Sequence, residues 1–144
     1  MRTRISIFIG VTTILLLTVS ATLFGQVYKL KSTSFSSCYR IDNYNWSKWT
    51  ETEEASALIT FDVTNDRITI YSKVTQVYDI AEYEGKTTDK DGDDTYSYYC
   101  VDKDGVTCRV RWFVLTSQDR SMQLYVNYKD VGWLYNIYSL DNNL

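Results

Sequence analysis

The chain has 144 residues, 15 basic and 18 acidic side chains, and a formal net charge of −3. It contains no histidine, which excludes Ser-His-acid and Cys-His catalysis and histidine-ligated zinc or copper. The acidic balance argues against nucleic acid as a partner, because phosphate binding needs a basic surface.

Residues 1–25 have the pattern of a secretory signal, and we expect them to form a signal helix. Two arginines precede an uncharged, apolar run over 5–24. Cleavage after Gly25 is favoured over cleavage after Ala21. An uncleaved membrane anchor is the alternative, because about 20 apolar residues suffice to span a bilayer. Either way the remaining chain is extracytoplasmic (secreted, periplasmic or at the cell surface), and it contacts a membrane only through this segment, if uncleaved.

Residues 26–144 are expected to form a single exported β domain. Their number, 144 − 25 = 119, is the size of one domain. Without the two arginines the net charge becomes 13 − 18 = −5. Thirteen tyrosines, four tryptophans and no proline suit β-strands, and aromatic enrichment also suits exposed binding surfaces.

The first part of this domain shows a weak strand pattern. Val27 to Leu30 is predicted to be a strand, and the Ser/Thr-rich stretch that follows has no clear period. The segment 43–54 contains Trp46 and Trp49 and is interpreted as a loop with a short strand.

A tight hairpin is predicted around Asn65-Asp66. Apolar residues alternate on both sides of this turn, and the expected register pairs Phe61 with Ile70 and Val63 with Ile68. A further strand is expected over 75–82, with Tyr78 and Ile80 inward.

The charged segment 84–94 is interpreted as a loop. Its acidic run has oxygen ligands of the kind that calcium uses, but the glycine is not where a helix-loop-helix site requires it. A hydrated hairpin tip is therefore preferred, and no metal site or cofactor is predicted.

The clearest pattern is a four-stranded meander over 96–138. Apolar residues occupy every second position from Val106 to Val114, which is typical of a strand with one buried face. Turns are expected at 102–105, 117–119 and 129–132, and they keep one apolar face in register through all four strands.

The first of these turns places Cys100 opposite Cys108. Three cysteines in an exported domain favour one disulfide, and we expect it between these two residues. The register makes them a hydrogen-bonded pair, in which side chains are less close than at the alternate sites. Cys38 bonded to either partner, or three reduced cysteines, are the alternatives.

These strands predict an all-β fold, an antiparallel meander forming a small barrel. Barrel closure removes exposed sheet edges, which favours it over the alternative, a two-sheet β-sandwich.

The face opposite the apolar one carries aromatic rings beside hydrogen-bonding groups, which is what a binding platform for a protein or glycan requires. Arg111 is expected across from Tyr125, and Tyr125 across from Asn136. The candidate platform residues are Tyr99, Arg111, Phe113, Tyr125 and Tyr138. Trp46 and Trp49 are further candidates for a contact surface.

The leading hypothesis is thus a non-enzymatic exported domain that binds an extracytoplasmic protein or glycan through this outer face. The second is a barrel that carries a small apolar ligand, which requires an internal cavity of roughly 300 Å3 or more. A hydrolase with two carboxylates, drawn from Glu51, Glu53, Glu54 and Asp62, is the least favoured. The oligomeric state stays open.

Three stretches carry a resemblance: RITIYSKVTQVYDI, CVDKDGVTCRVR and QLYVNYKDVGWLYNIY. Together they resemble small secreted β-rich proteins of unknown function of the Bacteroidota type. The resemblance covers most of the exported domain and implies export and the β class. It contains no catalytic motif and carries over no site residue.

Overall fold

The computed structural model describes residues 25–141, so the predicted signal helix lies outside the described residues. The strands are β1 (Val27–Tyr39), β2 (Glu53–Glu54), β3 (Leu58–Asp62), β4 (Arg67–Tyr71), β5 (Gln76–Thr88), β6 (Asp94–Asp102), β7 (Thr107–Leu115), β8 (Ser121–Asn127) and β9 (Val131–Ser139). A short 3-10 helix, η1 (Thr116–Gln118), joins β7 to β8. Across residues 25–141, no helix has the length and apolar character needed to cross a membrane.

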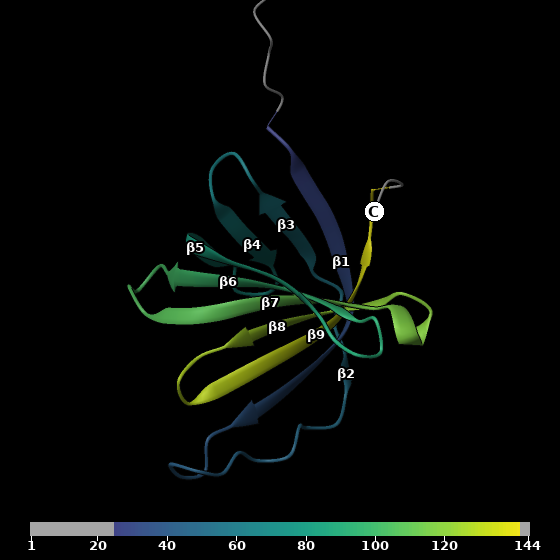
Figure 1. The fold of residues 1–144 in the computed structure, drawn as a ribbon. Coiled ribbons are helices and arrows are strands. Elements are labelled where there is room, and N and C mark those ends of the chain that lie inside the picture. Colours follow the sequence, from purple (N-terminus) through teal and green to yellow (C-terminus); the bar gives the residue numbers. More distant parts are fainter. Residues whose placement is uncertain (1–24, 142–144) are drawn as a thin grey trace, which may run out of the picture.

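The strands form one antiparallel sheet that closes into a barrel, as predicted (Figure 1). The sheet order is β2-β1-β3-β4-β5-β6-β7-β8-β9, and β1 also pairs with β9. β1 can do both because it is long: residues 27–31 pair with β3 and residues 30–39 pair with β9. All strands except β2 therefore make an eight-stranded barrel, and the two-sheet alternative does not apply.

The C-terminal meander has the predicted register from β6 to β8. The backbone N–H of Asp102 donates to the carbonyl of Val106 at 2.9 Å, which closes the expected turn. Arg111 lies opposite Tyr125 on β8, also as predicted. One further pairing was wrong: Tyr125 lies opposite Leu134, because the β8–β9 turn aligns Asn136 with Gln123.

The predicted disulfide is not present, and all three cysteines are free and buried. Cys100 and Cys108 are opposite each other on β6 and β7, so the register was right and the covalent bond was wrong. The physical reason is the type of pair: at hydrogen-bonded antiparallel sites the side chains are less close than at the alternate sites. Burial raises the pKa of each of these two thiols to about 12.

The β3–β4 hairpin differs from the prediction by two residues. Phe61 pairs with Ile68, so the turn holds four residues, 63–66. The Asp62 carboxylate accepts hydrogen bonds from the backbone N–H groups of Thr64 and Asn65, both at 3.1 Å, and this fixes the longer turn. A slip of two residues keeps the facing of the residues that pair, so Phe61 and Ile68 are still buried, whereas Val63 lies in the turn and is 55% exposed.

Two strands are longer than predicted. β1 continues through the Ser/Thr-rich stretch, where a bulge between Ser32 and Ser34 breaks the period. β5 continues to Thr88, so only residues 89–93 of the predicted loop are turn. β5 contains two irregularities, between Ile80 and Glu82 and between Tyr83 and Gly85. Bulges shift the alternation of side chains, which is why the pattern was not visible in either segment.

The two ends of the barrel differ. At the end with the β4–β5 and β8–β9 turns, Tyr78 is 1% exposed and Tyr135 and Tyr128 stand nearby, and a hollow of about 330 Å3 lies at the rim. The middle is a dense layer of fully buried aliphatic residues, Leu30, Ile59, Ile68, Ile70, Val110, Leu124 and Val126. The opposite end has the β3–β4, β5–β6 and β7–β8 turns. It is hollow, and aromatic side chains line it, among them Tyr28, Tyr98 and Trp112.

Candidate functional site

The hollow end of the barrel, here called the barrel mouth, consists of two adjoining lobes. The larger has a volume of about 470 Å3 and the smaller about 300 Å3. Both lobes are lined by Tyr28, Tyr83, Tyr98 and Trp112. The volumes reach the roughly 300 Å3 that a site for a small ligand requires.

The walls of the mouth come from strands far apart in the sequence. Tyr28 lies on β1, Tyr83 on β5, Tyr98 on β6 and Trp112 on β7. Val114 and Met122 contribute to the lining of the larger lobe, together with Arg120 from the β7–β8 turn. Phe61 and Ile80 contribute to the lining of the smaller lobe. The lining is therefore mostly aromatic and aliphatic, with the charged side chains of Arg120 at the larger lobe and of Asp62 and Asp66 at the smaller.

The aromatic rings contact one another and hold the mouth in shape. The ring centroid of Phe61 lies 5.6 Å from that of Tyr98 and 5.4 Å from that of Trp112. Tyr83 lies 5.2 Å from Tyr98, and Tyr96 lies 5.9 Å from Trp112. Tilted contacts at these distances are favourable, so the wall is supported by its own residues.

Two polar groups in this wall have unusual environments. The indole Nε1 of Trp112 is buried and has no hydrogen-bond partner within residues 25–141. Such a donor is destabilising by roughly 1–3 kcal/mol while it stays unpaired. Burial, reinforced by the neighbouring Tyr83, raises the pKa of Tyr98 to about 12, so its hydroxyl is neutral at physiological pH.

The residues of the predicted platform lie on the outer surface, in two groups and one isolated position. Phe113 on β7 contacts Tyr125 on β8 at 4.9 Å between ring centroids, and Trp49 meets Tyr125 edge-on at 5.8 Å. Tyr138 on β9 stands apart and is 42% exposed. The platform is thus more covered than expected, because Trp49 from the β1–β2 segment packs over part of it.

The second group lines a groove of about 530 Å3, here called the outer groove. Tyr99 on β6, Arg111 on β7 and Trp46 all line it. The segment between β1 and β2 therefore brings Trp46 to the same surface as the meander, a proximity that the sequence alone did not show. The groove also contains three more basic side chains, those of Arg40, Arg109 and Lys129.

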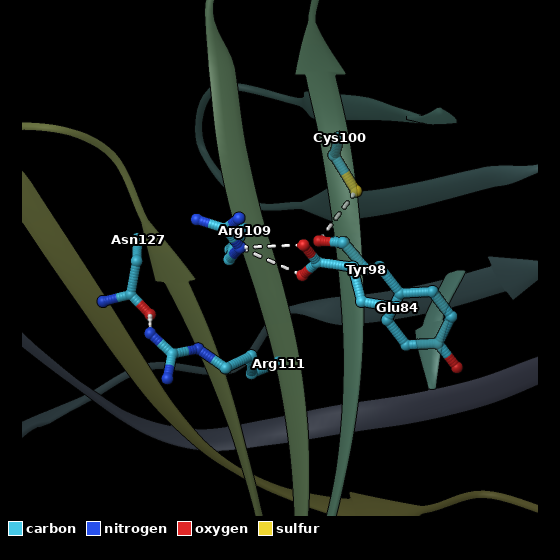
Figure 2. A network of polar contacts seen from close by, with 6 residues as sticks. All are labelled: Glu84, Tyr98, Cys100, Arg109, Arg111 and Asn127. Atoms are coloured by element: carbon cyan, nitrogen blue, oxygen red, sulfur yellow. Dashed lines mark hydrogen bonds and ion pairs between the residues drawn. The ribbon is translucent and has the colours of Figure 1, made fainter. Parts of the chain in front are cut away.

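Polar contacts arrange the arginines of this surface (Figure 2). The Nε of Arg109 donates to both carboxylate oxygens of Glu84, at 3.0 and 3.1 Å. Beside this pair, Nη2 of Arg111 donates to the side-chain oxygen of Asn127 at 3.1 Å, as Figure 2 shows. Burial raises the pKa of Tyr125, and the charge of Arg111 acts in the opposite direction.

Two acidic side chains, the hydrolase candidate Asp62 and Asp89 of the acidic loop, have structural roles. Asp62 holds the β3–β4 turn through Thr64 and Asn65. In the acidic loop, the Asp89 carboxylate accepts from the backbone N–H groups of Asp91 and Asp93. Over the described residues, no group of three or more potential metal ligands comes together.

The barrel mouth was the part of the site that the sequence analysis missed. Tyr96 and Tyr98 have the same parity as Cys100 on β6, so their inward direction followed from the predicted register. Tyr83 could not be placed in this way, because the irregularity at Ile80/Glu82 changes the alternation along β5 before it.

Comparison of the chain with protein-family models, with curated proteins and with solved structures found no match. The features that bear on function are therefore the geometry of the barrel mouth and that of the outer groove.

Proposed function

We propose that this chain is a non-enzymatic, exported β-barrel that binds a small apolar ligand in the barrel mouth. The observation that carries the proposal is the pair of adjoining lobes that share Tyr28, Tyr83, Tyr98 and Trp112. A barrel of this strand number has an interior just large enough for side chains or one small ligand. Here fully buried aliphatic side chains fill the middle of the barrel, and the mouth is hollow.

The lining indicates the class of ligand. Aromatic and aliphatic side chains favour a flat, mostly apolar molecule, because burial of its surface and ring contacts supply the binding energy. Catalysis is not part of the proposal, because the chain has no histidine and the Asp62 carboxylate beside the smaller lobe is engaged by the backbone N–H groups of Thr64 and Asn65.

The test uses the neutral aromatic probe N-phenyl-1-naphthylamine, whose emission rises when it leaves water. We expect saturable binding to the protein, and a loss of affinity of about tenfold or more in Met122→Trp, because the larger ring fills the main lobe. The matched control is Val106→Trp, an equally apolar change at an exposed residue of the β6–β7 turn, at the other end of the barrel.

Equal affinity of the wild type and Met122→Trp would place the probe elsewhere and contradict the proposal. So would a loss of the same size in Val106→Trp. Thermal melts of both variants establish that each remains folded, because an unfolded variant would lose the probe for an unrelated reason.

A second candidate function is binding of a protein or glycan through the outer face, the leading hypothesis from the sequence. The observation that favours it is the convergence of Trp46, Tyr99 and Arg111 on one groove. It is compatible with the first function, since the outer groove and the barrel mouth have no lining residue in common.

A further inference from the structure

The outer groove concentrates positive charge in a chain that is negative overall. Its lining includes Arg40, Arg109, Arg111 and Lys129, and none of the described residues that line it is acidic. The whole chain has a net charge of −3. A local excess of cations against the global balance is not expected from composition, and it attracts a ligand of opposite charge.

The charge of these cations is only partly cancelled. Arg109 is paired with Glu84 at 3.0 Å. Arg111 and Lys129 take part in none of the ion pairs formed within residues 25–141. The excess positive charge of the groove therefore lies with these two residues and with Arg40, which also forms none of those ion pairs.

Arg40 has a different role. Its guanidinium donates to the backbone carbonyls of Asp42, Asn43 and Lys129, at 3.0, 2.8 and 3.4 Å. These bonds hold the loop after β1 against the β8–β9 turn and leave the charge of Arg40 in place. The pKa of Asp42 is lowered chiefly by its hydrogen bond from Asn45, with only a minor effect of Arg40.

Arg111 has donors to spare. Within the described residues it makes one hydrogen bond, to Asn127, although a guanidinium has five N–H groups. Its Nε is buried with no partner there. A planar guanidinium binds carboxylate or sulfate with two parallel hydrogen bonds, and Asn127 holds this one in a fixed orientation beside the groove.

An aromatic ring completes the groove. Trp46 is 43% exposed, and an isolated β-bridge to Arg40 holds its backbone in place. Tyr99 lies beneath Arg109, with 5.7 Å between the guanidinium carbon and the ring centroid. An exposed ring offers a flat apolar surface on which the apolar face of a sugar ring packs, while neighbouring polar groups bond its substituents.

From these contacts we propose that the outer groove binds an anionic saccharide, one that carries a carboxylate or sulfate group. The proposal rests on the second candidate function above and names its ligand class. Arg111 and Lys129 bind the anionic group, and Trp46 packs against the sugar ring. The volume of about 530 Å3 is within the range of sites for small ligands and suits a short oligosaccharide.

The experiment measures binding of three probes by isothermal titration calorimetry at low salt. Tetragalacturonic acid supplies a carboxylate, a sulfated chondroitin tetrasaccharide supplies sulfate as well, and maltotetraose is the neutral comparison. We expect at least one anionic probe to bind, with affinity reduced about tenfold or more in Arg111→Gln and also reduced in Lys129→Gln.

Arg67→Gln is the matched control. Arg67 is an exposed arginine on β4, paired with Asp79 and distant in the sheet order from β7, so this change removes the same charge outside the groove. We expect it to change affinity less than twofold. Lys129 is exposed and makes no side-chain hydrogen bond within the described residues, so Lys129→Gln remains informative if Arg111→Gln does not fold.

Two results would overturn the proposal: no binding of either anionic probe at millimolar concentration, or equal losses in Arg67→Gln and Arg111→Gln. If maltotetraose binds as tightly as the anionic probes, the charge preference fails while glycan binding stands. Trp46→Ala tests glycan binding in the outer groove separately from the preference for charge. Loss of all saccharide binding in Trp46→Ala supports the outer groove, whereas unchanged binding removes the groove from the second candidate function as well.

Discussion

The three cysteines give the most direct test at the residue scale. In denaturant, a thiol reagent should detect three thiols per chain, because no disulfide joins any of them. In the folded protein at pH 8, Cys100 and Cys108 should react very slowly, since burial raises their pKa to about 12 and keeps them protonated. A count of one thiol in denaturant, without reductant, would restore the disulfide that the sequence predicted.

Gly132 offers a second prediction at this scale, about packing on the outer surface. A Cβ at this position would lie 2.9 Å from the Sγ of Cys38 and 3.2 Å from Nδ2 of Asn127. We expect Gly132→Ala to lower the free energy of unfolding by about 1–3 kcal/mol, the usual range for overpacking. Urea denaturation measures the loss.

The same site provides its own control. If the contact with Cys38 causes the loss, Cys38→Ala should remove the nearest atom and restore part of the stability of Gly132→Ala. Additive effects in the double variant would show that the contact with the thiol is not the cause.

At the scale of elements, the acidic β5–β6 loop is hydrogen-bonded to η1, which joins β7 to β8. The Asp93 carboxylate accepts hydrogen bonds from both the backbone N–H and the hydroxyl of Ser117 in η1, each at 2.8 Å. Asp93→Ala should therefore lower the free energy of unfolding by about 1 kcal/mol, because two exposed hydrogen bonds are lost.

Asp91 in the same loop is the comparison. Its side chain is exposed and makes no hydrogen bond within the described residues, so Asp91→Ala should change stability by less than about 0.5 kcal/mol. Equal midpoints of the two variants in urea would show that the link between the loop and η1 contributes nothing.

The elements that the sequence predicted well are those with uninterrupted alternation. From Val106 to Val114 every second residue is apolar, and the turns on either side follow from Gly and Asp chemistry, so the registers of β6 to β8 were correct. β1 and β5 each contain a register irregularity, and β1 has serines at inward positions such as Ser32. A period cannot be followed across a bulge without knowing the partner strand.

The candidate sites were predicted in part for the same reason. Arg111 and Tyr125 were placed opposite each other from local turns alone. The proximity of Trp46 to Arg111 and of Tyr28 to Trp112 depends on barrel closure between β1 and β9, which is a long-range pairing. No local pattern contains that information.

For the whole molecule, the buried cysteine thiols and tyrosine hydroxyls, which are neutral when protonated, predict a loss of stability at alkaline pH. Burial raises the pKa of Cys100, Cys108 and Tyr98 to about 12, and it also raises the pKa of Tyr78 and Tyr128. In the unfolded chain these groups ionise near their ordinary values of 9.0 and 10.0. The unfolded state thus releases protons first, and stability falls as pH rises from about 9 to 12.

Thermal melts between pH 8 and 11 measure this decline. Tyr98→Phe removes one of the groups without removing its ring, so its melting temperature should fall less steeply over the same interval. A melting temperature that is constant from pH 8 to 11 would contradict the burial of these groups.

The pairing of β1 with β9 also determines when the barrel can be completed. Ser34 lies next to Asn136, so the contact that closes the sheet joins residues about 100 positions apart. Contacts of such long range fold slowly, because a large loop must be closed before they form. A chain emerging from its N-terminus exposes one edge of β1 until β9 has followed it. Until the last strand has been synthesised, the free edge of β1 is therefore open to pairing with other chains.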